Sequence, residues 1–210
     1  MITAFKRLVA RHWPVLRFRT IIFGTLLFVA ALPGIGAVFL RVYENALVRR
    51  TEAELVAQSA ALAAGAATLW PGAESGATRI IGPYQEPATE VDLQSSTIMT
   101  ERPPPVRAHP PVDGTALSVV QAMAPALAET KMVTLASIQM LDRNGVVLNG
   151  YGAGGGLKNV PEVAAALRGQ PTTVLRRNAS YRQVYPLEWL SRASSIRLHH
   201  ARPIRVGDSI

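Results

Sequence analysis

Cysteine is absent from the 210-residue chain, and this absence excludes several classes of protein. Without thiols the chain can form no disulfide scaffold, no thiolate metal site and no cysteine nucleophile, so its stability must come from a hydrophobic core. The sequence also lacks the G-x-S-x-G and H-E-x-x-H motifs and any paired-carboxylate spacing that would indicate a hydrolase. We therefore expect no catalytic residues, no cofactor and no metal site.

Charge is missing from one long segment near the N-terminus, Thr20 to Leu40. At about 1.5 Å per helical residue this segment is long enough to cross a hydrocarbon core of roughly 30 Å. A cleaved export signal is the alternative, but its apolar region is usually about 7 to 15 residues and ends at a small-residue cleavage site. The residues that follow Leu40 offer no such site. We expect residues 20–40 to form a retained transmembrane helix.

The flanks of this segment predict its orientation. The basic stretch 1–19 carries five Lys and Arg residues and no acid, whereas three arginines follow the span among acidic residues. By the positive-inside rule the N-terminus is then cytoplasmic and the chain from Arg41 onward is outside the cytoplasm. The same five charges account for most of the formal charge of +8, so the basic character indicates membrane topology and no nucleic-acid partner.

Residues 41–70 continue as a predicted helix, because apolar residues recur there at spacings of three and four. A helix that extends a membrane span outward could carry a displacement, so we interpret it as a signalling helix. It also has an alanine-rich seam. We expect Tyr43 to Leu69 to serve partly as a homodimer interface and partly to pack on the chain's own domain.

The rest of the chain divides into a Pro-rich insertion and an α/β module. Residues 71–114 hold eight of the fifteen prolines and are predicted to be irregular. The module occupies residues 115–210. Its predicted elements are a helix Ala116–Met132 capped by Asp113 or Thr115 and interrupted at Pro125, a strand Val133–Leu141, a tight turn Asp142–Gly145 leading to a second arm Val146–Asn149, a helix Pro161–Leu167, and strands Thr172–Leu175 and Ser195–Val206.

The segment Gly150 to Gly156 satisfies the G-x-G-x-x-G pattern of dinucleotide-binding loops. It follows the second arm of a hairpin, however, and no acidic residue stands about 20 positions later. We therefore interpret it as a flexible loop over a sensor pocket.

Three segments carry a resemblance to a known family: IQMLDRNGVVLN, VPEVAAALRGQ and RLHHARPIRVGDSI. Together with the preceding helix they resemble a PAS-like or Cache-like sensor module, as found in the N-terminal half of bacterial two-component sensor histidine kinases. The resemblance implies an α+β fold with an antiparallel sheet and flanking helices. It also implies a signal-sensing input region in the bacterial inner membrane, whose response regulator is reached only through cytoplasmic kinase domains that this chain does not contain.

No kinase residue can be placed on this sequence, and the predicted final strand is followed by a Gly-Asp turn without a second arm. We therefore expect a truncated receptor with an open sheet edge that aggregates readily when expressed alone. The alternative is a single-pass membrane protein whose exported domain binds a protein partner or scaffolds an envelope assembly.

Arginine is concentrated between Arg168 and Arg205, where the only acid is Glu188. Guanidinium groups suit carboxylate or phosphate, so one interpretation is a site for a small anionic ligand. The alternative, which we favour for most of these arginines, is a solvated basic face or one that rests on anionic lipid headgroups. The adjacent His199 and His200 point to opposite faces of a strand and cannot readily share a metal. Our candidate ligand-binding residues are Arg197, His199 and Arg202, with Tyr185 as a possible wall.

Overall fold

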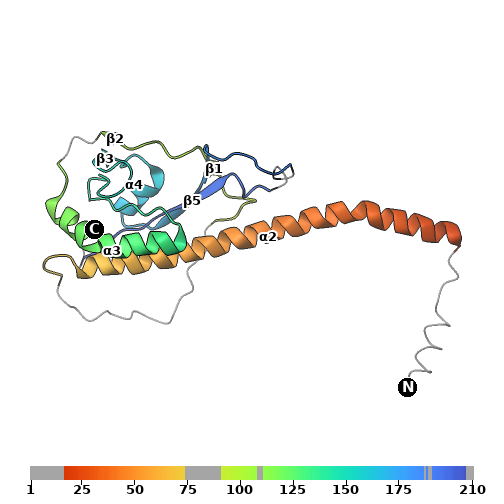
Figure 1. The fold of residues 1–210 in the computed structure, drawn as a ribbon, viewed down its shortest axis with the longest axis horizontal. Helices are drawn as coiled ribbons and strands as arrows, with labels where there is room; N and C mark the ends of the chain where they lie inside the picture. The colour runs from red at the N-terminus through yellow and green to blue at the C-terminus, as the bar shows by residue number, and fades with distance from the viewer. Residues whose placement is uncertain (1–16, 74–90, 108–110, 187, 189–190, 207–210) are drawn as a thin grey trace, which may run out of the picture. The chain divides into compact units, whose positions relative to one another are not determined.

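The computed structural model describes residues 17–73, 91–107, 111–186, 188 and 191–206 (Figure 1). The predictions for the basic stretch before residue 17, for much of the Pro-rich insertion and for the turn at Gly207 lie outside the described residues. The fold is α+β, with a long N-terminal apolar helix and a small mixed sheet. Its elements are α2 (Phe18–Thr68), β1 (Ile98–Met99), β2 (Val106–Arg107), α3 (Gly114–Thr134), β3 (Gly155–Gly156), α4 (Pro161–Leu167), β4 (Thr172–Arg177) and β5 (Ile196–Ala201). Two compact units result, Met1–Tyr43 and Glu44–Ile210.

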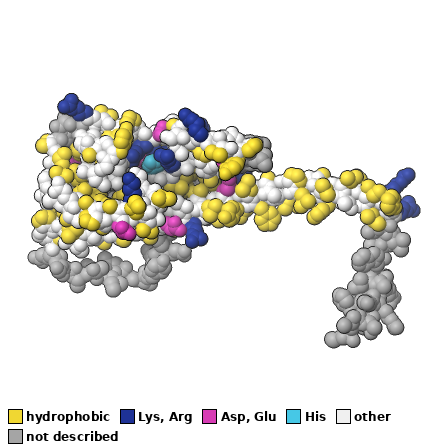
Figure 2. Space-filling model, viewed as in Figure 1, with side chains coloured by type: hydrophobic (Ala, Val, Ile, Leu, Met, Phe, Trp, Pro, Cys, Tyr) yellow, Lys and Arg dark blue, Asp and Glu magenta, His cyan; other side chains and the backbone are white. Residues whose placement is uncertain are grey.

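The described part of the first unit consists of the beginning of α2. Its large apolar side chains are exposed, and Phe23, Leu26 and Phe28 each present more than half of their surface to solvent. Figure 2 shows these hydrophobic side chains on the surface along the helix. Among the described residues, α2 is the one helix long and apolar enough to span a membrane.

The second half of α2 is one wall of the second unit. The helix runs for 51 residues through Pro33, so the predicted span and the predicted signalling helix form one continuous element. One face of it binds the segment that follows residue 90: Asn45 accepts from the Leu93 amide at 3.0 Å, and Glu52 accepts from the Val91 amide at 3.1 Å. The described part of the predicted irregular insertion is therefore docked on α2 and buries Val91 and Leu93.

Helix α3 lies beside the C-terminal part of α2 (Figure 1) and buries its apolar face against it. The predicted cap is confirmed, because Asp113 Oδ1 accepts from the amides of Thr115 and Ala116 at 2.9 and 3.3 Å. The predicted interruption at Pro125 is wrong, since α3 continues through this residue. The shared core consists of Ala66, Ala116, Val119, Val120, Met123, Leu127, Met140 and Leu148.

The predicted strand Val133–Leu141 is also wrong in most of its length. Its first two residues, Val133 and Thr134, belong to α3. The Thr134 hydroxyl donates to the Thr130 carbonyl at 2.7 Å, one helical turn back, and this bond supports the helical conformation. Leu135 then ends the helix in the left-handed region, with φ 56°. Pairing begins only at Met140 and Leu141, and the tight turn Asp142–Gly145 is confirmed by the bond from the Asp142 amide to the Val146 carbonyl.

The main sheet has the strand order β1-β4-β5. Strands β4 and β5 are antiparallel, with Thr173 opposite His200 and Arg176 opposite Arg197. Strand β1 is parallel to β4, so the predicted purely antiparallel sheet is corrected to a mixed one. Parallel pairing is possible because β1 and β4 are joined by a long connection that contains α3 and α4.

Helix α4 matches its prediction, with Pro161 in its first turn, and β5 ends before Pro203, which cannot donate to a neighbouring strand.

The glycine-rich loop is a packed element and contains β3, which pairs with β2. A Cβ at Gly152 would lie 2.5 Å from Pro105 Cγ, and a Cβ at Gly155 would lie 2.5 Å from Pro105 Cβ. Gly152 also has φ +82°, which an L residue rarely adopts. The interpretation as a flexible loop is therefore wrong, because the glycines allow the ring of Pro105 to approach the backbone.

Candidate functional site

The two faces of the main sheet separate the predicted ligand-binding residues. Side chains alternate along a strand, and Leu175 belongs to a hydrophobic cluster with Val48 of α2. Its neighbour Arg176 points the other way and pairs with Glu162 of α4. The sheet thus has an α2 face and an α4 face.

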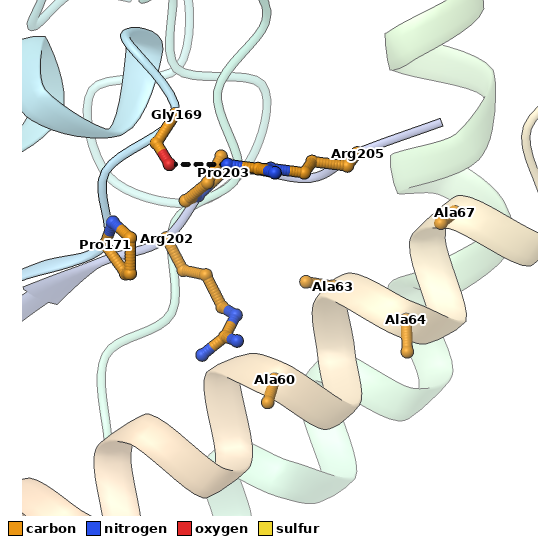
Figure 3. Close-up of a pocket in the computed structure, with 9 residues that line it drawn as sticks. All are labelled: Ala60, Ala63, Ala64, Ala67, Gly169, Pro171, Arg202, Pro203 and Arg205. Carbon is orange, nitrogen blue, oxygen red and sulfur yellow. Dashed lines mark hydrogen bonds between the residues drawn. The ribbon is translucent and has the colours of Figure 1, made fainter. Parts of the chain in front are cut away.

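A pocket of about 380 Å³ lies on the α2 side, between this helix and the chain that follows β5 (Figure 3). Four alanines of α2 form one wall, and prolines and arginines form the opposite one. Figure 3 shows the side chain of Arg202 reaching toward α2 at Ala60. The lining residues are Ala60, Ala63, Ala64, Ala67, Gly169, Pro171, Arg202, Pro203 and Arg205.

The charge of this pocket is positive. Arg205 donates from Nη2 to the Gly169 carbonyl at 2.8 Å and is held in place by that bond. Arg202 forms no hydrogen bond or ion pair with any described residue, so its donors are free for a ligand. Nearby, burial and then the charge of Arg202 lower the pKa of His200. An anion with a short apolar body matches a pocket that has a free guanidinium and a methyl-lined wall.

His200 is positioned by the sheet. Its Nδ1 lies 3.0 Å from the Thr173 hydroxyl on the neighbouring strand, while its Nε2 is buried and has no hydrogen-bond partner among the described residues. A buried ring nitrogen without a partner is uncommon and can accept a proton or a ligand donor. Its placement beside the charge of Arg202 adds a titratable group to this side of the sheet.

The α4 face carries a buried ion pair. Arg176 Nε donates to Glu162 Oε1 at 3.0 Å, and its Nη2 donates to Oε2 at 2.8 Å. Both side chains are only 4% exposed. The remaining nitrogen, Nη1, donates to the Thr100 carbonyl at 3.1 Å, which ties β4 to the residue that follows β1.

Two of the predicted ligand-binding residues, Arg197 and His199, lie together on this α4 face, where they are opposite Arg176 and Val174. Arg202 belongs to the α2 pocket. Tyr185 is 68% exposed in the connection between β4 and β5, and among the described residues no hydrogen bond joins its side chain to the other three. The four residues therefore do not form one constellation.

The sequence contained a signal for the pocket wall, because alanines recur every three or four positions along the helix. From the sequence alone this seam indicates only a helix interface. Arg205 and the ion pair of the α4 face were missed, since their roles depend on which strands pair.

Comparison with protein-family models, with curated proteins and with solved structures finds no match to this chain.

Proposed function

We propose that the chain is the membrane-anchored, extracytoplasmic input region of a signalling receptor of the sensor histidine kinase type. The observation that carries this proposal is that α2 contains the apolar span and also supplies the alanine wall of the pocket. A ligand in the pocket would therefore contact the helix that continues into the membrane. In this proposal the N-terminus is cytoplasmic, the anchor lies in a bacterial inner membrane, and the sheet with its flanking helices is a PAS-like or Cache-like module.

The ligand of this pocket would be a small carboxylate, bound through Arg202 with its apolar part against Ala60 and Ala63. Binding would alter how tightly residues 60–67 of α2 pack on the loop that contains Pro203. Such a change in packing is what a helix continuous with the span could pass on, because an α-helix resists compression along its hydrogen-bonded axis.

The test uses the full chain in lipid nanodiscs and a panel of carboxylates from acetate to pentanoate. Binding is measured as a shift in thermal unfolding, and hydrogen exchange of residues 57–68 reports the response of α2. We expect one of these carboxylates to protect this segment, and Arg202→Gln to abolish both effects. Arg177→Gln is the matched control, because the Arg177 residue is exposed and its side chain forms no hydrogen bond with any described residue.

Binding without a change in α2 exchange would reject the input function and leave a binding module. Absence of binding across the panel would reject the pocket as a carboxylate site.

A second candidate function is docking of a protein partner or scaffolding of an envelope assembly. It is favoured by the apolar end of α3, where Met132, Val133 and Leu135 are 76%, 74% and 89% exposed. Large apolar side chains gathered at one exposed helix end are typical of contact surfaces. Replacing all three by Ser should then abolish partner capture in membranes while leaving carboxylate binding intact.

A further inference from the structure

The α4 face of the sheet has more positive charge than its ion pair balances. Arg102 follows β1 by three residues and is half-buried. Its charged neighbours are Glu162 and Arg176, and burial is the main cause that lowers its pKa. Glu162 already accepts two bonds from Arg176, and no hydrogen bond or ion pair to Arg102 occurs within the described part of the chain. A partly desolvated guanidinium is thus left without a partner of its own.

Two further donors lie on the α4 face of the sheet. Arg197 is exposed and lies directly opposite Arg176 on the neighbouring strand. His199 is two residues further along β5, so it points to the same side. The charged groups that act on His199 are Arg102, Arg176, Arg197 and Glu162, so among the described residues three positive charges are balanced by one carboxylate.

The imidazole of His199 is a neutral donor in this setting. Burial, followed by the charge of Arg102, lowers its pKa to about 4, and Glu162 opposes this effect. Arg176 and Arg197 lower it further. At neutral pH the ring therefore has one N–H group and no charge, and the groups that repel a proton from it are the groups that attract an anion.

We propose that Arg102, Arg197 and His199 form a binding site for a small oxyanion such as phosphate, separate from the pocket on α2. A half-buried cation without a partner is costly, and an oxyanion offsets that cost while it accepts bonds from guanidinium and imidazole donors. The buried Arg176–Glu162 pair provides a rigid base beneath the site. Because Arg102 follows β1 and Arg197 belongs to β5, the bound anion connects the two outer strands of the sheet.

The experiment follows the imidazole signals of His199 by NMR in the full chain, held in nanodiscs of zwitterionic lipid near neutral pH. Inorganic phosphate is titrated at constant ionic strength. We expect a saturable shift of the His199 signals and a higher midpoint of thermal unfolding. Arg102→Gln should weaken phosphate binding about tenfold or more, and Arg102→Lys should weaken it less. Arg202→Gln should leave it unchanged, which separates this site from the pocket.

A second arm distinguishes a free ion from a lipid headgroup. Nanodiscs with anionic phospholipid replace phosphate in the buffer, and an Arg102-dependent shift of His199 in this arm identifies a headgroup phosphate as the occupant. The proposal is overturned if the His199 signals respond in neither arm. It is also overturned if they respond in Arg102→Gln and in Arg197→Gln as strongly as in the unsubstituted chain. Should Arg102→Gln fail to fold, the comparison of Arg197→Gln with Arg177→Gln gives the same decision.

Discussion

Arg176 and Glu162 form a two-pronged ion pair in the interior of the second unit, with nitrogen–oxygen distances of 3.0 and 2.8 Å. The pair joins the central strand of the sheet to α4, and its third donor reaches the residue after β1. Because both side chains are almost fully buried, neither charge can turn to water when the other is removed.

Truncation of this pair should be strongly destabilising. We expect Arg176→Ala to lower the free energy of unfolding by about 3–5 kcal/mol, because it leaves the Glu162 carboxylate buried without a partner. The double variant with Met at both positions should lower the free energy of unfolding by less than Arg176→Ala alone. Urea unfolding of the full chain in detergent micelles gives both values. Equal losses in the single and double variants would show that the buried charge is not the cause.

The glycine-rich loop provides a prediction with an internal control. Gly152 and Gly154 have nearly the same backbone conformation, with φ +82° and +84°, but only Gly152 faces Pro105. Gly154→Ala should cost about 1–2 kcal/mol from the left-handed backbone alone. Gly152→Ala should cost more, and Pro105→Ala should relieve the difference, because it removes the Cγ atom that a Cβ at residue 152 would meet. The same unfolding measurement decides this, and a Gly152→Ala loss no larger than that of Gly154→Ala would contradict it.

The stability of the chain should fall as the pH is lowered through the weakly acidic range. His199 has a pKa of about 4 in the folded state against about 6.5 when unfolded, so the unfolded chain binds the proton more readily. The stabilisation that results is fully present above pH 6.5 and is lost as the pH falls toward 4. His199→Gln should flatten this part of the profile and leave the same-signed contribution of His200 in place. An unchanged profile would mean that His199 is not the group that titrates.

Homodimer formation through α2 is expected on the face that the domain leaves open. Ala57 and Ala61 are exposed at a spacing of four and do not line the pocket, whereas Ala66 is buried against α3. Single cysteines at the two exposed positions should cross-link between copies in membranes, and a cysteine at Ala66 should not. Uniform cross-linking, or none at all, would exclude this face as the interface.

The direction of insertion can be measured with paired reporters fused after Ile210. The bias of five basic residues before the span against three after it predicts activity of a reporter that works only outside the cytoplasm. A cytoplasmic reporter at the same position should be silent. The opposite pair of results would reverse the topology and reject the extracytoplasmic input function.

Local chemistry explains which parts of the fold could be predicted from the sequence. The cap at Asp113, the first turn at Pro161 and the turn at Asn144-Gly145 each depend on residues within a few positions, and all three occur in the structure. The helical conformation of α2 could also be predicted, because its apolar pattern extends over many turns.

The extent of α3 was mispredicted for a local reason, but the strand pairing and the candidate site depend on contacts between distant segments. Nothing near Ile98 indicates that it joins a sheet, since its partner Leu175 lies far along the chain. The candidate site failed as a single constellation for the same reason. Arg197 and Arg202 are close in sequence, but the face that each occupies is decided by α4 and α2.

The parallel pairing of β1 with β4 joins two segments that are far apart in the sequence. Residues 98–99 are synthesised well before residues 175–176, and the hairpin and α4 lie between them. The closure of this long loop has an entropic cost before any ladder bond forms, so the contact belongs to the slow class of non-local pairings. Asn45 and Glu52 of α2 hold the amides of Leu93 and Val91 without any residue of β4. We therefore expect α2 to bind this segment before β4 has been synthesised, and so to retain β1 until its partner strand is available.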